Sequence, residues 1–314
     1  MTAPLLCIVG PTGSGKTDLA LALAREMPIE VLVADSRQVV REMNIGTAKP
    51  DAVARASVPH HLLDQVRPDE PYSVAMWVER ARLLVPEIAG RGRMPVVVGG
   101  TGLYVAALVD GHDYAAQAWS PEVRQRLADE LDADGLEPLA ARLMELDPEG
   151  AARTDPRNPR RVLRALERAE AAGGGVIPTA EPYAGSVAMV GLDRPREVLY
   201  RRIDARARWL FVEGGLLDEV RGLLSAGYGP ELRPMTGHGY GEAARHLAGE
   251  WSLDRAIEIT ARRTRQYAKR QLSWFRRDPR VEWMPAGDDE GDAPDLVRAV
   301  VARATQLGEG SPID

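Results

Sequence analysis

Residues 7–24 read CIVGPTGSGKTDLALALA, and this stretch decides the fold. Its apolar start is typical of a buried strand, its middle is a glycine-rich turn, and its alanine- and leucine-rich end is typical of a helix. The turn, residues 10–17, satisfies the pattern G-x-x-x-x-G-K-[ST] in full. Backbone N–H groups at such a turn point toward phosphate oxygens. The stretch therefore predicts a phosphate cradle, and it leaves open whether the phosphate is transferred or expelled.

The positions of the turn have expected parts in that cradle. The backbone N–H groups of residues 12–17 would face phosphate oxygens, Lys16 would neutralise their charge, and the Thr17 hydroxyl would ligate Mg²⁺. Magnesium is therefore the expected cofactor and Thr17 the expected metal ligand. The predicted phosphate-binding residues are Gly10, Pro11, Thr12, Gly13, Ser14, Gly15, Lys16 and Thr17.

Strand and helix patterns alternate along the chain, which favours a parallel sheet covered by helices. The expected buried parallel strands are short runs rich in Val, Ile and Leu, at residues 5–10, 30–35, 94–100 and 186–193. The predicted fold class is α/β, with a P-loop NTPase-like parallel sheet flanked by helices and an all-helical insertion domain.

The insertion is predicted from a change of pattern between residues 119 and 172, where apolar residues recur at spacings of three and four. The strand pattern resumes near Val187. We expect a discontinuous catalytic core at 1–115 and 186–286, a helical insertion domain at 116–185 that contacts the substrate, and an acidic C-terminal tail with a short helix at 287–314.

The composition excludes a membrane-spanning protein. The chain has 314 residues, of which 45% are hydrophobic and 27% charged, and no apolar run approaches the roughly 20 residues that cross a bilayer. No basic stretch precedes an apolar run at the amino terminus. We expect a cytoplasmic protein without membrane contact. The single cysteine, Cys7, is expected to be a small apolar core residue.

The carboxyl ends of parallel strands form the usual ligand crevice, and two further segments are expected there. Asp35 ends the second strand, in VLVADSRQV. Its carboxylate could lie in the outer coordination shell of magnesium, act as a general base, or cap a turn. Thr101 lies in VGGTGLY, residues 98–104, and offers a hydroxyl. The glycines of that segment permit either close approach of a ligand or tight packing.

Adjacent histidines at positions 60 and 61 suggest a metal site, but no cysteine or third histidine lies at ligand spacing. We therefore interpret His60 and His61 as part of a structural loop.

Positive charge is concentrated in two segments, although the net charge is −6. Residues 259–280 are basic and aromatic, and in a helix Arg262, Gln266, Lys269, Ser273 and Arg277 would share one face. Such a stripe fits a phosphate backbone, while the alternative is a solvated surface helix.

A second basic cluster lies at residues 157–168. Two basic elements beside one phosphate crevice favour a nucleic-acid substrate over a free nucleotide. The three lysines of the chain, Lys16, Lys49 and Lys269, stand among 37 arginines, 40 basic residues less three, and this rarity marks Lys49 and Lys269 as weak functional candidates.

Eight segments in one order resemble a known family. They are GPTGSGKT, ADSRQVVREMNIGTAKP, PHHLLD, YSVAMW, VVGGTGLY, NPRRVLRALE, GYGE and TRQYAKRQLSWFRR, between Ile8 and about Arg277. Together they resemble the bacterial tRNA dimethylallyltransferases. The resemblance implies transfer of a dimethylallyl group from its diphosphate to N6 of the adenosine just 3′ of the anticodon. The cradle would then hold a leaving diphosphate, and the partners would be the tRNA anticodon stem-loop and dimethylallyl diphosphate.

The resemblance also implies site residues. Asp35 would be the general base on the adenine amine, with Lys16 and Thr101 as further catalytic residues. Residues 10–17 would bind the diphosphate. The implied tRNA contacts are Asp35, Ser36, Arg37, Gln38, Thr101, Val123, Pro159, Arg160, Arg161, Val162, Leu163, Gly239, Tyr240, Lys269 and Arg270.

The chain departs from the usual pattern of that family at a few positions. Val40, Glu42 and Asn44 stand where Tyr, Gly and Asp are usual, and HGYGE at 238–242 replaces Ile-Gly-Tyr-Lys-Glu. Two other functions remain: a P-loop kinase, which would have no use for the basic helix, and a nonenzymatic RNA-binding module, which would leave Asp35 and Thr101 without a role. A monomer is expected.

Overall fold

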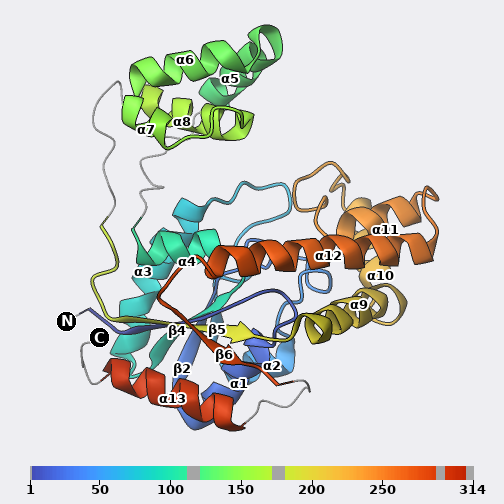
Figure 1. The fold of residues 1–314 in the computed structure, drawn as a ribbon. Helices are drawn as coiled ribbons and strands as arrows, with labels where there is room; N and C mark the ends of the chain where they lie inside the picture. The colour runs from blue at the N-terminus through green and yellow to red at the C-terminus, as the bar shows by residue number, and fades with distance from the viewer. Residues whose placement is uncertain (1, 112–120, 172–180, 288–293, 309–314) are drawn as a thin grey trace. The chain divides into compact units, whose positions relative to one another are not determined.

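The computed structural model describes residues 2–111, 121–171, 181–287 and 294–308 (Figure 1). The chain divides into two compact units. The core unit comprises Met1–Val109 and Ala184–Asp314, and the helical unit comprises Asp110–Tyr183. Each is described by itself below.

The core unit is built on a six-stranded sheet with the order β3-β2-β4-β1-β5-β6. All neighbouring strands pair in parallel, with Cys7 of β1 opposite Val97 of β4 and Met189 of β5. The strands are β1 (Leu5–Val9), β2 (Ile29–Val33), β3 (His60–His61), β4 (Met94–Gly99), β5 (Val187–Asp193) and β6 (Val281–Pro285).

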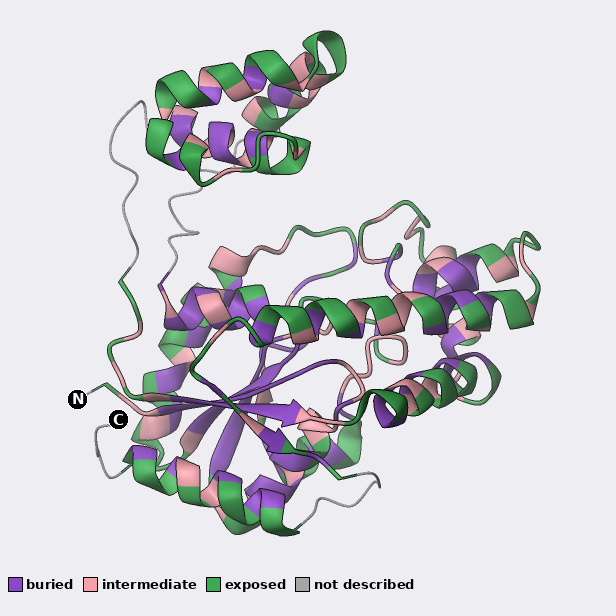
Figure 2. Cartoon of the chain, in the orientation of Figure 1, coloured by how far each residue is buried: buried purple, intermediate pink, exposed green. Residues whose placement is uncertain are grey.

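The central strands are apolar throughout because helices cover both faces of the sheet. Ile8 and Val98 belong to the cluster that packs under α1 and α13, while their neighbours point to the face covered by α3 and α4. Figure 2 shows these strands as buried along their length. The helices of the core unit are α1 (Lys16–Glu26), α2 (Ala52–Ser57), α3 (Val74–Gly90), α4 (Gly102–Val109), α9 (Arg196–Val212), α10 (Leu216–Ser225), α11 (Tyr240–Leu247), α12 (Leu253–Phe275) and α13 (Pro294–Gly308).

The C-terminal segment includes helix α13. Helix α13 buries Leu296, Val300 and Leu307 in the same cluster as α1 (Figure 1). Apolar residues at helical spacing bury this face, although the residues before it are acidic. The expected helix is therefore present at Pro294–Gly308, and it packs into the core of this unit.

The described helices of the helical unit enclose a small core of their own. Leu127, Leu143 and Val162 are buried there, together with Leu166. The contact-based division falls at Val109/Asp110 and Tyr183/Ala184. The expected second boundary, 185/186, lies two residues further on, and the expected first boundary, 115/116, lies outside the described residues. The helices are α5 (Pro121–Asp134), α6 (Leu136–Leu146), α7 (Pro148–Ala152) and α8 (Pro159–Ala171).

The predicted fold class is confirmed as a parallel sheet between helices with an additional helical unit. Cys7 is fully buried in β1, and burial raises the pKa of its thiol to about 12. Across the described ranges, no helix combines the length and the apolar composition that a membrane span needs.

Candidate active site

The glycine-rich turn connects β1 to α1 at the carboxyl edge of the sheet. Gly10, Gly13 and Gly15 have φ of 141°, 81° and 96°, values that other residues adopt only with strain. This backbone path brings the chain into α1 at Lys16, where the first N–H groups of the helix lack intrahelical acceptors. The turn therefore presents N–H groups to an anion, as the sequence predicts.

One N–H group of the cradle differs from the expectation. The Thr12 N–H donates to Oε1 of Gln271, 2.9 Å away on α12, so it faces the protein and not a phosphate. Lys16 Nζ donates to the Pro11 carbonyl at 2.7 Å. Ser14 Oγ is buried and has no hydrogen bond among the described residues.

Lys16 is a desolvated cation between two carboxylates. Burial lowers the pKa of its ammonium group from 10.5 to about 8, while the charges of Asp35 and Asp18 act in the opposite direction. A desolvated ammonium group attracts an anion more strongly than a hydrated one. Lys16 is thus suited to receive a diphosphate.

Helix α9 supplies cations that the sequence analysis did not identify. Arg202 Nε donates to the Gly13 carbonyl at 3.1 Å, and Arg194, just before the helix, donates through Nε to the Ser14 carbonyl at 3.3 Å. Burial lowers the pKa of Arg206, and the charges of Asp35 and Asp18 oppose this. Arg202 and Arg206 are one turn apart, but solvated arginines commonly have the same spacing, so no pattern in the sequence distinguished them.

Asp35 acts as a cap for the turn that follows β2. Its Oδ1 accepts from the backbone N–H groups of Arg37 at 2.8 Å and Gln38 at 3.4 Å. Within the described ranges, Oδ2 has no hydrogen bond. Of the alternatives for Asp35, the turn cap is therefore realised, and one carboxylate oxygen is left for chemistry.

Thr101 lies beside this turn, as the sequence analysis expected. Its Oγ1 accepts from the Ser36 N–H at 3.1 Å, and its own N–H donates to the Ala34 carbonyl at 3.1 Å. Tyr267 on α12 lies near Thr101, and burial raises the pKa of its phenol to about 12. The structure thus brings Asp35 and Thr101 together at the ends of neighbouring strands.

The glycines around Thr101 are explained by packing. A Cβ atom at Gly99 would lie 2.1 Å from the Ala34 carbonyl oxygen, one at Gly100 2.1 Å from Gln271 Nε2, and one at Gly102 2.2 Å from Trp274 Cδ1. A side chain at Gly99 would displace the backbone after β2, and one at Gly100 or Gly102 would displace side chains of α12. Of the two alternatives for this segment, tight packing accounts for all three glycines.

The loop after β2 is held by buried polar contacts. Gln38 Nε2 donates to the carbonyls of Thr47 and Ala48, each at 3.1 Å. The side chain of Lys49 is 1% exposed and forms an ion pair with Asp64 at 2.5 Å. Lys49, a weak functional candidate from its rarity, therefore has a structural role.

Tyr240 and Glu219 hold the same loop from α10 and α11. The Tyr240 hydroxyl donates to Glu219 Oε1 at 2.5 Å. The Glu219 carboxylate also accepts from the backbone N–H groups of Asn44 at 2.7 Å and Ile45 at 2.9 Å. Tyr240 is 2% exposed, and a Cβ atom at Gly46 would lie 2.3 Å from its ring. The Tyr240 side chain, an implied RNA contact, is therefore enclosed by protein, as is Gly239 beside it.

His60 and His61 form the short edge strand β3. The expectation that they lie in a loop is therefore wrong. His61 Nε2 lies 2.6 Å from Glu30 Oε2, and Arg91 binds the same carboxylate. Among the described residues, no group of three or more His, Cys, Asp or Glu side chains could hold a metal ion. The pair stabilises the sheet edge.

Helix α12 exposes a largely basic and polar face and buries an opposite one. Arg262, Gln266, Lys269, Arg270 and Ser273 are exposed on the helix, and Arg277 is exposed just beyond its end at Phe275. The buried face carries Gln271 and Phe275. We call the five residues of the predicted stripe, Arg262, Gln266, Lys269, Ser273 and Arg277, the α12 stripe, although the helix ends two residues before Arg277.

The helical unit places only part of the predicted RNA-contacting segment at its surface. Pro159, Arg160 and Arg161 are exposed at the start of α8, whereas Val162 is fully buried and Leu163 packs against the core. Val123 also packs partly against that core. The side chain of Val162 is thus unavailable to RNA.

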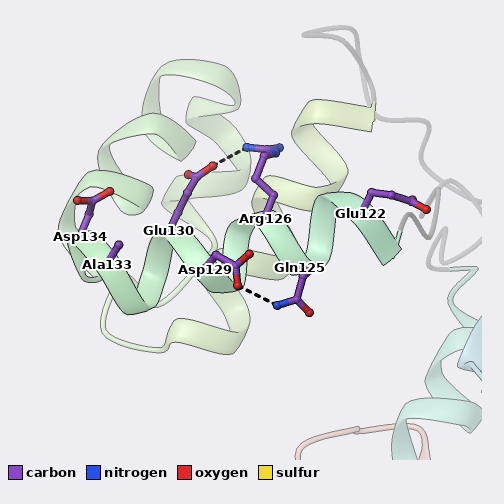
Figure 3. A pocket seen from close by; sticks show the side chains of 7 residues that line it. All are labelled: Glu122, Gln125, Arg126, Asp129, Glu130, Ala133 and Asp134. Atoms are coloured by element: carbon purple, nitrogen blue, oxygen red, sulfur yellow. Dashed lines mark hydrogen bonds and ion pairs between the residues drawn. The ribbon is translucent and has the colours of Figure 1, made fainter.

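Helix α5 of this unit has a different surface. Figure 3 shows a hollow along it in which Arg126 pairs with Glu130 at 2.7 Å and Gln125 donates to Asp129 at 2.8 Å. Glu122 and Asp134 also line this hollow. Its excess of carboxylates disfavours a phosphate backbone, in contrast to the start of α8.

Comparison with known proteins identifies the family. A family model described as IPP transferase matches residues 38–278, and one described as isopentenyl transferase matches residues 3–65. The chain belongs to the IPP transferase family. The tRNA dimethylallyltransferase of Syntrophobacter fumaroxidans is 45% identical over 94% of this chain and 87% of its own. That of Roseiflexus castenholzii is 45% identical over 98% and 99%.

Solved structures of IPP transferases have the same fold. The full-length tRNA isopentenylpyrophosphate transferase of Bacillus halodurans has a TM-score of 0.71 and 37% identity, covering 98% of each chain. A eukaryotic dimethylallyltransferase acting on tRNA has a TM-score of 0.80 over all of this chain and 81% of its own, and at 24% identity it shows the fold alone. The family resemblance predicted from the motifs is confirmed.

The burial of Tyr240 leads to a test. We expect Tyr240→Phe to lower the free energy of unfolding by about 1.5–3 kcal/mol, because it removes a hydrogen bond to a charged carboxylate. Chemical denaturation measures this loss, and Tyr228→Phe is the control, since the Tyr228 hydroxyl has no hydrogen bond in the part of the chain that the structure describes. Unchanged stability with weakened RNA binding would instead make Tyr240 an RNA contact.

Proposed function

We propose that this IPP transferase moves a dimethylallyl group from dimethylallyl diphosphate to N6 of the adenosine immediately 3′ of the anticodon in tRNA, releasing diphosphate. One observation carries the proposal: a carboxylate, Asp35, lies within electrostatic range of Lys16 in the phosphate cradle and of Arg206 on α9, and burial desolvates both cations. Relatives across the whole chain are named tRNA dimethylallyltransferases, which supports the same reaction.

The cradle would stabilise the leaving diphosphate. Its backbone N–H groups, Lys16 and Arg206 supply fixed positive charge where negative charge grows as the allylic C–O bond breaks. Electrostatic stabilisation of this kind is strongest where water is excluded, as the lowered pKa of Lys16 indicates for this position. The allylic carbon can then become electrophilic enough for a weakly nucleophilic amine.

Asp35 would accept the proton that N6 of adenine loses as the new C–N bond forms. Its Oδ1 is held by the turn of residues 36–38, which leaves Oδ2 for the amine. Thr101 accepts from the N–H of Ser36, the residue after Asp35, so its hydroxyl lies beside the same turn. These contacts hold both groups before substrate arrives, which reduces the entropy cost of alignment.

The donor set at the cradle fits Mg²⁺. The Thr17 hydroxyl has no hydrogen bond within the described residues, and hard oxygen ligands of this kind are those that magnesium prefers. Thr17 would hold the ion together with oxygens of the diphosphate. Bound magnesium would supply additional charge neutralisation for the leaving group.

RNA would approach along basic surfaces of each unit. The α12 stripe and the exposed Arg160 and Arg161 provide separated cations for phosphates, and such contacts fix register without reading bases. An adenine stacked in the anticodon loop cannot reach the donor carbon, so the base has to be flipped toward Asp35. We place the protein in the cytoplasm, working as a monomer.

The test of this function is a product assay. Purified protein, Mg²⁺, labelled dimethylallyl diphosphate and an unmodified tRNA with adenosine 3′ of its anticodon are combined, and the digested nucleosides are analysed by mass. We expect N6-dimethylallyladenosine at that position and one diphosphate per product. Controls lack donor or carry guanosine at the target position. ATP hydrolysis or phosphoryl transfer without prenylated nucleoside would refute the proposal.

Asp35→Asn separates basicity from turn capping, because the amide oxygen can still accept from Arg37 and Gln38. We expect turnover to fall by about 10²- to 10⁴-fold, the range for removing a general base. RNA affinity and thermal stability should stay near wild type. Asp35→Ala also removes the cap and should show a further loss of stability. Near-normal turnover of Asp35→Asn would exclude the base role.

The lowered pKa of Lys16 predicts that kcat/KM for the donor falls at alkaline pH. Below its pKa of about 8 the ammonium group is charged and attracts the diphosphate; above it the charge is lost. We expect kcat/KM for the donor to fall roughly tenfold per pH unit above that value, since this parameter reports the free enzyme. Lys16→Arg, whose side chain stays charged, should show no such limit. A flat wild-type profile to about pH 9.5 would contradict the assignment.

A further inference from the structure

We propose that Gln271 is a positioning residue that holds the diphosphate cradle at a fixed distance from the Asp35–Thr101 pair. Gln271 is a polar side chain that is only 6% exposed, on the inner face of α12. This inference rests on the proposed function, because the spacing of cradle and carboxylate affects turnover only if both take part in the same reaction.

Both ends of the Gln271 amide are used, and each holds a different loop. Oε1 accepts from the Thr12 N–H in the cradle at 2.9 Å, and Nε2 donates to the Gly100 carbonyl after β4 at 2.8 Å. The two partners lie 259 and 171 residues away in the chain. One amide therefore joins the loop that would bind diphosphate to the loop that carries Thr101.

The space around this amide is closed. A Cβ atom at Gly100 would lie 2.1 Å from Gln271 Nε2 and 3.2 Å from the Gly10 carbonyl oxygen. The two glycine-rich loops thus approach each other with the amide between them. In such a packed site the spacing of the loops depends on the shape and hydrogen bonding of the inserted group.

Helix α12 also lies beside the Asp35–Thr101 pair. Tyr267 precedes Gln271 by four residues and therefore lies on the same face of the helix. It lies near Thr101, whose hydroxyl accepts from the Ser36 N–H beside Asp35. Gln271 itself joins the cradle to the loop of Thr101, so α12 sets the distance between them.

A neutral amide is needed because one end must accept and the other must donate. Leucine does neither, and a glutamate carboxylate only accepts, so it would face the Gly100 carbonyl with like partial charge. A protonated glutamic acid does both with nearly the same shape. Burial and the facing carbonyl raise the pKa of such a carboxyl group, which gives a substitution whose effect depends on pH.

The experiment compares Gln271→Leu and Gln271→Glu with wild type in the product assay. We expect Gln271→Leu to lower kcat by about 10²-fold, the cost of misalignment near 1 Å, with the KM for RNA almost unchanged. Gln271→Glu should resemble it at about pH 8.5 and recover toward wild type as pH falls to about 6, as its carboxyl group gains a proton. Groups that titrate in both proteins affect both activities alike and cancel in the activity ratio.

Gln306→Glu on α13 is the matched control, since Gln306 is exposed and remote from the cradle, and its activity ratio to wild type should not change with pH. A second readout needs no reaction: the rise in melting temperature on adding Mg²⁺ and inorganic diphosphate should be smaller for Gln271→Leu than for wild type. Full kcat in Gln271→Leu, or a Gln271→Glu ratio independent of pH, would overturn the positioning role. Wild type that makes no prenylated product would instead overturn the proposed function, and the diphosphate shift would still test Gln271.

Discussion

The close approach of β2 and β4 at their carboxyl ends is the constraint on which the site depends. Gly99 leaves no space for a side chain, since a Cβ atom there would lie 2.1 Å from the Ala34 carbonyl oxygen. The same carbonyl accepts from the Thr101 N–H. The backbone itself therefore places Thr101 beside the turn that Asp35 caps. Hydrogen bonds from buried backbone are costly to lose, so this adjacency is rigid.

Burial makes the positive charges of the site energetically costly. Lys16, Arg37 and Arg206 all have pKa values lowered by desolvation, and the Asp35 carboxylate opposes that shift for each of them. Such cations are under-compensated, and an entering diphosphate would relieve the electrostatic cost. A net charge of −6 for the whole chain says nothing of this local excess. Global charge governs solubility and approach, whereas binding depends on a few desolvated groups.

The sequence was sufficient for the fold class, the cradle and the proximity of Asp35 to Thr101, because these follow from local patterns and from the rule that parallel strands end at one edge. The sequence was insufficient where the role of a residue depends on a contact with a residue that is distant in the chain. No sequence pattern indicated that the Tyr240 hydroxyl would be buried in a hydrogen bond to Glu219. Val162 lies next to exposed arginines in the sequence, but its position on the helix places it in the core. The glycines at 99, 100 and 102 were visible, but only the positions of Ala34 and of α12 explained them.

The geometry at Gly99 also bears on whether phosphate is transferred or expelled. A P-loop kinase or NTPase needs a carboxylate near its magnesium and phosphates, usually at the end of an apolar strand. Here β4 ends at Gly99, and packing against Ala34 excludes a side chain of any kind at that position. Of the two carboxylates near Lys16, Asp18 on α1 lies 3.8 Å from Arg202, whereas Asp35 caps a turn that leads into the loop that Gln38 and Glu219 hold. That location suits a base that receives a proton from a second substrate, and it favours a diphosphate that departs as a leaving group.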